Sequence, residues 1–146
     1  MIFERSQQYA EVFSHGAFSG CEKNPGRCRV NLHHQRERVV GKALSLDPWD
    51  ERGLTGTLRL ARTRDADQAL ALAEDGILRR LGRLPGPLPG GETWETRGRR
   101  RISRAELDHI GLTPDPAYET AKVLAVRGRR PSETPNLDRA RALLAR

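Results

Sequence analysis

A succession of short strand patterns separated by turn signals, between residues 28 and 76, most constrains how this chain can fold. Neighbouring side chains of a strand point to opposite faces, so the first pattern has one mainly apolar face and one polar face. These sets are Cys28, Val30, Leu32 and His34 on the apolar side, and Arg29, Asn31 and His33 on the other. We therefore expect a strand that ends at His34, with its imidazole pointing inward.

A second strand should return to the same sheet. It begins at Val39, after a charged turn, and runs to about Leu46. Six residues separate His34 from Gly41, which is the spacing that a hairpin between the two strands would produce.

A third strand and a helix follow. Gly53 ends a polar turn, where we expect a positive φ, and the alternation of residues 54–60 predicts a half-buried strand. Thr63 is a typical N-cap for a helix over residues 65–74, and Gly76 is a typical C-terminal stop.

The rest of the chain gives weaker patterns. Strands are expected over residues 77–81, 92–97, 102–113 and 121–126, with either a strand or a helical turn over residues 9–13. Residues 83–91 hold three prolines and three glycines, so we expect them to be the least ordered internal segment. The expected domain covers residues 1–127, followed by a linker and a short amphipathic helix in residues 128–146.

The 146 residues suit one domain, and no apolar stretch is long enough to span a membrane. The N-terminus lacks the basic-then-apolar order of a signal peptide. Disulfides are rare in proteins without an export signal, so we expect Cys21 and Cys28 to be reduced and structural.

The net charge is +7 and is carried almost wholly by arginine. Such a field attracts nucleic acid or an acidic protein partner, which keeps a basic nucleic-acid-binding module as one alternative function. No aromatic residues are interleaved with the arginines to stack on bases, so a solvated basic surface is the preferred interpretation.

Several short motifs occur in an order and spacing similar to those of the prohead (capsid maturation) protease family of tailed phages. They are the segment from Glu11 to Phe18, His34-x6-Gly41, Gly53-Leu54, Thr63 with its helix, Asp75-Gly76, and Pro116-Ala117-Tyr118. Each motif is weak alone, but the resemblance extends over roughly residues 9 to 127. It implies a compact, mainly β fold of the α+β class, an antiparallel barrel with packed helices.

The resemblance also implies a serine endopeptidase that cleaves scaffold segments of the capsid protein inside the prohead, in the host cytoplasm. Its partner would be the capsid or scaffold protein, with a homo-oligomer left open, and no cofactor, metal or membrane is expected. The family usually carries a further strand before residue 9, which this chain is expected to lack.

The resemblance assigns the catalytic positions residue by residue. His34 corresponds to the general base, and His109 stands where the family has a carboxylate that orients the base. The related herpesvirus assemblins use a second histidine in that role. The family's serine falls at Gly82, where Leu-Ser-Val-Gly-Phe is replaced by Leu81-Gly82-Arg83-Leu84-Pro85. We expect His34 and His109 on neighbouring strands, within reach of a hydrogen bond or one bridging water.

Acyl transfer needs a nucleophile, a base and a group that orients the base, and glycine has no side chain that could attack. The sequence therefore predicts a catalytically impaired homologue, kept for capsid assembly or decaying in a prophage. An active peptidase with a relocated nucleophile is the alternative, with Ser45, Ser103 and Cys28 as candidates. Neither serine has a strand-to-turn setting, and Cys28 would lie about 20 Å from His34 along a strand.

A zinc site formed by His33, His34 and His109 is disfavoured. The first two would point to opposite faces of the expected strand, and no cysteine or carboxylate shows ligand spacing.

Overall fold

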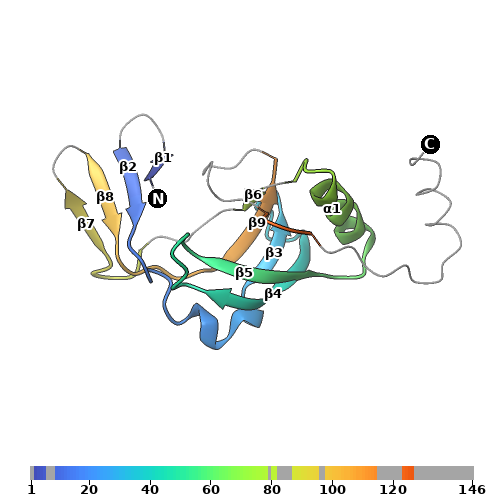
Figure 1. Cartoon of the computed structure of the whole chain (residues 1–146), viewed down its shortest axis with the longest axis horizontal. Helices are drawn as coiled ribbons and strands as arrows, with labels where there is room; N and C mark the ends of the chain where they lie inside the picture. The colour runs from blue at the N-terminus through green and yellow to red at the C-terminus, as the bar shows by residue number, and fades with distance from the viewer. Residues whose placement is uncertain are drawn as a thin grey trace, which may run out of the picture.

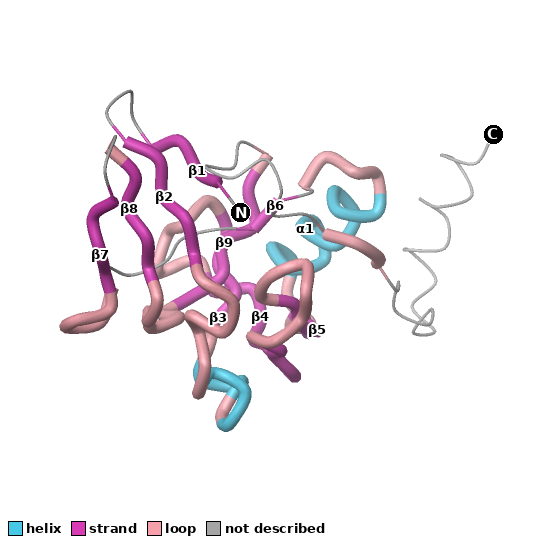
Figure 2. The backbone as a smooth tube through the Cα atoms, turned by 60° about the vertical axis from the view of Figure 1, so that its left-hand side comes forward, coloured by secondary structure: helices cyan, strands magenta, loops and turns pink. Residues whose placement is uncertain are grey.

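The computed structural model describes residues 2–5, 9–78, 80–81, 87–95, 98–114 and 123–126, which form two sheets and one α-helix (Figure 1). The first sheet has the strand order β1-β2-β8-β7, and the second has the order β5-β4-β3-β9-β6. Figure 2 shows the helix α1 beside the second sheet and away from the first. The mainly β, α+β class expected from the sequence is confirmed.

The second sheet is built from β3 (Arg29–Leu32), β4 (Val39–Asp47), β5 (Thr55–Leu60), β6 (Arg80–Leu81) and β9 (His109–Thr113). The expected hairpins β3-β4 and β4-β5 are present, and the turn before β5 contains Gly53 at φ 110. However, β9 pairs parallel with β3, so the sheet is mixed rather than antiparallel. Closure into a barrel is not confirmed, because β5 and β6 are the two edges among the described strands.

The helix α1 (Arg64–Glu74) forms where local signals place it. The hydroxyl of Thr63 accepts a hydrogen bond from the backbone N–H of Ala66 at 3.3 Å, which satisfies one of the free donors of the first turn. Gly76 follows the helix at φ 73, the left-handed conformation that commonly ends helices. Within the described residues, no helix is long and apolar enough to cross a membrane.

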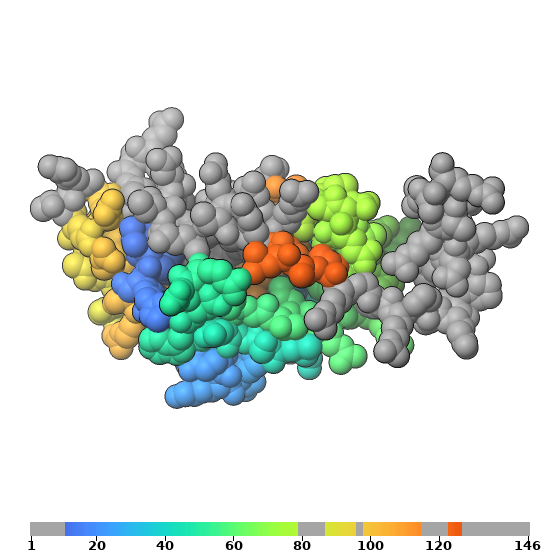
Figure 3. Space-filling model, viewed as in Figure 1, coloured from blue at the N-terminus to red at the C-terminus, as the bar shows by residue number. Residues whose placement is uncertain are grey.

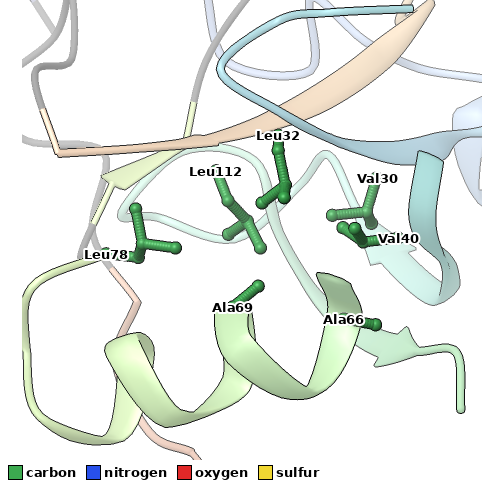
Figure 4. Close-up of a cluster of buried hydrophobic side chains, with 7 residues drawn as sticks. All are labelled: Val30, Leu32, Val40, Ala66, Ala69, Leu78 and Leu112. Atoms are coloured by element: carbon green, nitrogen blue, oxygen red, sulfur yellow. The ribbon is translucent and has the colours of Figure 1, made fainter. Parts of the chain in front are cut away.

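One face of the second sheet is buried against α1 (Figure 4). The cluster comprises Val30, Leu32, Val40, Ala66, Ala69, Leu78 and Leu112. The two alanines come from α1, and their small side chains let the helix lie close to the sheet. Because Val30, Leu32 and Leu112 face this core, the residues that alternate with them on β3 and β9 face the other side of the sheet.

The first sheet is built from β1 (Ile2–Arg5), β2 (Tyr9–Phe13), β7 (Glu92–Glu95) and β8 (Arg99–Ile102). Residues 9–13 are therefore a strand rather than a helical turn. The expectation that no strand precedes residue 9 is wrong, since β1 pairs antiparallel with β2. The pairing of β2 with β8 is parallel, which a sequence pattern alone does not reveal.

The segment after β2 connects the two sheets. Phe18 joins Ala17, Ile102 and Ala105 in a buried cluster. The indole ring of Trp49 occupies the space where a Cβ on Gly16 would lie, and Gly16 has φ 71. Figure 3 shows the turn between β4 and β5 against this N-terminal segment.

Two expected strands need correction. Residues 102–113 do not form one strand, because β8 ends at Ile102 and β9 begins at His109 in the other sheet. The chain turns between them, where Ser103 N–H donates to the carbonyl of Gly91 and Ala105 N–H to that of Ala17. Residues 123–126, within the last expected strand, have no strand conformation. Val123 instead packs against the core beside α1.

Part of the proline- and glycine-rich segment is held in place. Leu88 N–H donates to the carbonyl of Arg104 at 3.1 Å, and Gly91 N–H donates to the carbonyl of Leu88 at 2.7 Å. The backbone of these residues is irregular, since Pro87 and Ala105 form only an isolated bridge. That the segment is the least ordered internal part of the chain stays a prediction. Residues 83–86 of the same segment lie outside the described residues.

Replacing Gly41 by alanine should destabilise the fold by about 1–3 kcal/mol, the usual cost of overpacking. Its new methyl group would overlap the backbone carbonyl oxygen of Arg59, which cannot move without disturbing the β4-β5 pairing. Urea unfolding would measure the change. Gly26→Ala is the matched control, because no atom lies within 4 Å of the added carbon. Equal stability of the two variants would contradict this account of Gly41.

Candidate active site

His34 lies in a tight turn rather than at the end of a strand. β3 ends at Leu32, and the turn is closed by the bond from Gln35 N–H to the carbonyl of Leu32. His33 and His34 have φ values of 49 and 61, a left-handed conformation that costs a non-glycine residue about 1 kcal/mol or more. The predicted strand was therefore two residues too long. The two left-handed residues leave His33 exposed and His34 half-buried.

The His34 ring packs directly on β9. Its Nδ1 and Cε1 atoms occupy the space where a Cβ on Gly111 would lie. Gly111 pairs with Asn31 in the parallel register of β3 and β9, so the turn folds back over the strand pair that precedes it. A glycine at position 111 is what permits this approach of the imidazole.

The structure brings His34 and His109 together. Their ring centroids are 5.9 Å apart, and the rings are inclined at 61°, an edge-to-face arrangement. His109 is the first residue of β9 and is only 6% exposed. The two residues therefore lie side by side as expected, although one is in a turn and the other on a strand.

A carboxylate that sequence reasoning missed holds His109. Nδ1 of His109 is 3.0 Å from Oδ2 of Asp108, and the same oxygen accepts a hydrogen bond from Nη2 of Arg36 at 3.0 Å. An ionised carboxylate can only accept, so His109 donates through Nδ1–H. The other ring nitrogen, Nε2, is buried and has no hydrogen-bond partner among the residues described. In the neutral ring this nitrogen is the acceptor.

Asn31 is a second polar residue that the alternation pattern did not single out. It is 2% exposed, and its Oδ1 is buried without a hydrogen-bond partner in the described part of the chain. Because Asn31 pairs with Gly111, its side chain shares the sheet face of Gly111 and His109. Three polar groups, from His34, His109 and Asn31, thus gather on the sheet face opposite the hydrophobic core.

The candidate serines for a relocated nucleophile lie away from this cluster. The hydroxyl of Ser103 donates to the carbonyl of Gly91, in the connection that leaves the first sheet. Ser45 lies six residues beyond Val39, the β4 residue that pairs with Asn31. At the rise of a strand this separation is about 20 Å.

The cysteine candidate is unsuited for a different reason. The thiol of Cys28 packs in a cluster with Ala43, Leu46 and Ile110, on the face of the sheet opposite His109. Burial raises its pKa to about 11, with smaller contributions from Cys21 and Asp108. The thiolate is the nucleophilic form of cysteine, so a thiol held protonated is inert. Both cysteines are free, as expected.

The arginines of β8 are neutralised by carboxylates. Arg100 binds Glu11 at 2.9 Å and also contacts Glu92, while Arg101 binds Glu95 at 2.6 Å. Trp94 lies across from Arg100, 5.8 Å from the guanidinium carbon to the ring centroid, so one aromatic residue does accompany this basic cluster. The paired carboxylates nevertheless neutralise these two arginines, so this cluster offers little free positive charge for phosphate contacts.

Gly82, the third expected site residue, lies outside the described residues, as does the Pro116-Ala117-Tyr118 motif. Among the residues that are described, no group of three histidines, cysteines or carboxylates is arranged to hold a metal ion.

The folded protein should lose stability as the pH rises from about 9 to about 11. The pKa values of Cys21 and Cys28 are raised to about 11, chiefly by burial. The native state therefore keeps protons that the unfolded chain releases, and the free energy of unfolding falls with pH in this window. Chemical unfolding at a series of pH values would measure the loss. A Cys21→Ser/Cys28→Ala variant with an unchanged pH dependence would count against this cause.

Asp108→Ala should change the tautomer of His109. Without its acceptor, Nδ1–H loses a charge-assisted hydrogen bond, and the tautomer ratio should shift on the order of tenfold toward Nε2–H. Nitrogen NMR of the imidazole at pH 8, above the ordinary histidine pKa of about 6.5, would report the protonated nitrogen. Arg36→Ala is the control, because it leaves the Asp108 carboxylate in place. Identical spectra for wild type and Asp108→Ala would refute the assignment.

Comparison with known proteins identifies the chain at the family level. The family described as caudovirus prohead serine protease matches residues 1–135. The chain has no significant match among curated proteins or among solved structures.

Proposed function

The chain belongs to the caudovirus prohead serine protease family, and on that premise we propose that it is a capsid-assembly protein whose peptidase activity is lost or severely impaired. Membership of this family supports a role like that of a phage capsid-maturation protease. The proposal adds that the base and its orienting group remain, whereas the nucleophile does not. Its partner would be the capsid or scaffold protein, inside the prohead in the host cytoplasm.

The pairing of β6 with β9 is the observation that carries this proposal. Leu81, the last residue of β6, pairs with Leu112, and the residue before Leu112 in β9 is Gly111, on which the His34 ring lies. The residue that follows Leu81 in the sequence is Gly82, the position to which the resemblance assigns the family's serine, and glycine has no side chain.

The retained groups fit the two other catalytic roles. His34 and His109 adjoin, and Asp108 orients the His109 ring through Nδ1–H. Nε2 of His109 is thereby left as a buried hydrogen-bond acceptor, which could hold a neighbouring imidazole in one tautomer. Loss of the nucleophile from such a unit typically lowers turnover on the order of a million-fold.

A relocated nucleophile is the competing proposal, and the described residues give it little support. Ser45 lies in the distant part of β4, Ser103 lies in the connection after β8, and the Cys28 thiol has a raised pKa. Absence of labelling by a fluorophosphonate probe is therefore expected for the wild-type protein.

The purified protein should show no turnover of capsid-like or generic peptides, because position 82 offers no attacking oxygen. Gly82→Ser alone should recover little, since Arg83-Leu84-Pro85 replaces the family's Val-Gly-Phe. A displacement of about 1 Å can cost a hundred-fold in rate. Restoring Ser-Val-Gly-Phe over residues 82–85 is the stronger test, with His34→Ala in that background as its control.

Cleavage by the wild-type protein that His34→Ala abolishes would overturn the proposal and require a search for another nucleophile. Restored activity that survives His34→Ala would instead remove His34 from the role of base.

A further inference from the structure

A row of positive charges crosses the outer face of the second sheet. Arg29 of β3 pairs with Lys42 of β4, and Lys42 pairs with Arg59 of β5. Paired residues of neighbouring strands point to the same face, so the three side chains stand directly side by side. All three are exposed, and their face is opposite the one that packs on α1. We call these three residues the cationic row.

The cationic row is not neutralised within the described chain. Neither Arg29, Lys42 nor Arg59 has an ion pair or a side-chain hydrogen bond among the described residues. The strands β3, β4, β5 and β9 carry a single carboxylate, Asp47, at the far end of β4. Like charges placed directly opposite on neighbouring strands are destabilising. The contrast with β8 is plain, because there Arg100 and Arg101 bind glutamates.

The row ends at the histidines. Arg29 pairs with His109 in the parallel register, so His109 is the fourth member of the same line across the sheet. Neighbouring strands are about 4.8 Å apart, which gives a length of about 14 Å from Arg59 to His109. An extended peptide covers this distance in roughly four residues at about 3.3 Å each.

We propose that the cationic row binds an acidic polypeptide segment and directs it along this face of the sheet to His34 and His109. One part of the peptide would lie at the histidines. Its carboxylates within about four residues of that part would pair with Arg29, Lys42 and Arg59. The inference rests on the proposed function for the location of the peptide-binding site, but it does not require that the protein cleaves the peptide. A homologue that cannot cleave would keep the means to bind an acidic stretch of its capsid or scaffold partner.

A polypeptide fits this surface better than a nucleic acid does. The four strands β3, β4, β5 and β9 contain no phenylalanine, tyrosine or tryptophan on which a base could stack. The row also ends at His109, beside His34, the two residues to which the proposed function assigns the roles of orienting group and base. Three cations over about 10 Å, at a strand spacing of about 4.8 Å, are few for tracking a phosphate backbone.

The test measures binding of a fluorescein-labelled peptide of alternating glutamate and serine, with glutamine replacing glutamate in a second peptide. The wild-type protein should bind only the acidic peptide, with an affinity that falls as salt is added. Lys42→Gln/Arg59→Gln should weaken binding about tenfold, since each exposed ion pair contributes a factor of up to about five.

The control is Lys23→Gln/Arg64→Gln, which removes the same charge. Both residues are exposed, and Arg64 lies on the helix that covers the opposite face of the sheet. This variant should bind the peptide within about twofold of wild type, as expected for charges largely screened by salt. Equal weakening by the two double variants would show a general charge effect and overturn the proposal.

A labelled single-stranded oligonucleotide distinguishes the other class of partner. Tighter binding of the oligonucleotide than of the acidic peptide, lost in Lys42→Gln/Arg59→Gln, would assign the row to nucleic acid and overturn the peptide proposal.

Lys42→Gln alone should keep or raise Tm, because it relieves repulsion from both neighbours. A lower Tm would contradict the claim that repulsion within the cationic row destabilises the fold. Cleavage of the peptide by the wild-type protein would overturn the proposed function and leave the binding result standing.

Discussion

The parallel pairing of β3 with β9 is the constraint on which the rest of the structure depends. It directs Val30, Leu32 and Leu112 toward α1, and that apolar burial fixes which residues of the two strands face the other side. A slip by one residue would turn the apolar set outward and bury charge, so the register is strongly specified. The positions of His109, Asn31 and Arg29 on the outer face follow from the packing of the inner face.

The outer face holds groups that folding alone does not favour. His109 and Asn31 are buried polar residues with atoms that lack partners among the described residues, and His34 occupies a strained left-handed turn. The cationic row adds repulsion on the same face. Most buried polar groups in proteins are satisfied, and departures from that rule concentrate at functional sites. Their gathering on one side of one sheet supports a binding face there, even where the chemistry has been lost.

Local signals in the sequence were sufficient for the elements near the core. The cap at Thr63, the stop at Gly76 and the alternation in β4 and β5 each depend on neighbouring residues, and each predicted the observed element. The resemblance to prohead proteases selected His34 and His109, which do adjoin. Their roles in catalysis remain proposals.

Features that depend on distant residues were missed. The end of β3 is set by a turn with two left-handed histidines, which alternation cannot indicate. Asp108 carries no spacing signal of its own, and its importance appears only when Arg36 and His109 meet around it. The cationic row is likewise invisible in sequence, because Arg29, Lys42 and Arg59 become neighbours only through strand register.

The same parallel pairing has a consequence for when the protein can act. More than half of the chain lies between Arg29 and His109, and the intervening residues include β4, β5, α1 and two of the four strands of the first sheet. Strand pairings between residues this distant in sequence form slowly and late, since closing the long loop costs conformational entropy before the pairing can stabilise the chain. During synthesis, His34 leaves the ribosome long before its partner strand does. The two histidines therefore meet only after β9 has been synthesised, and no fragment that ends before His109 can carry their site.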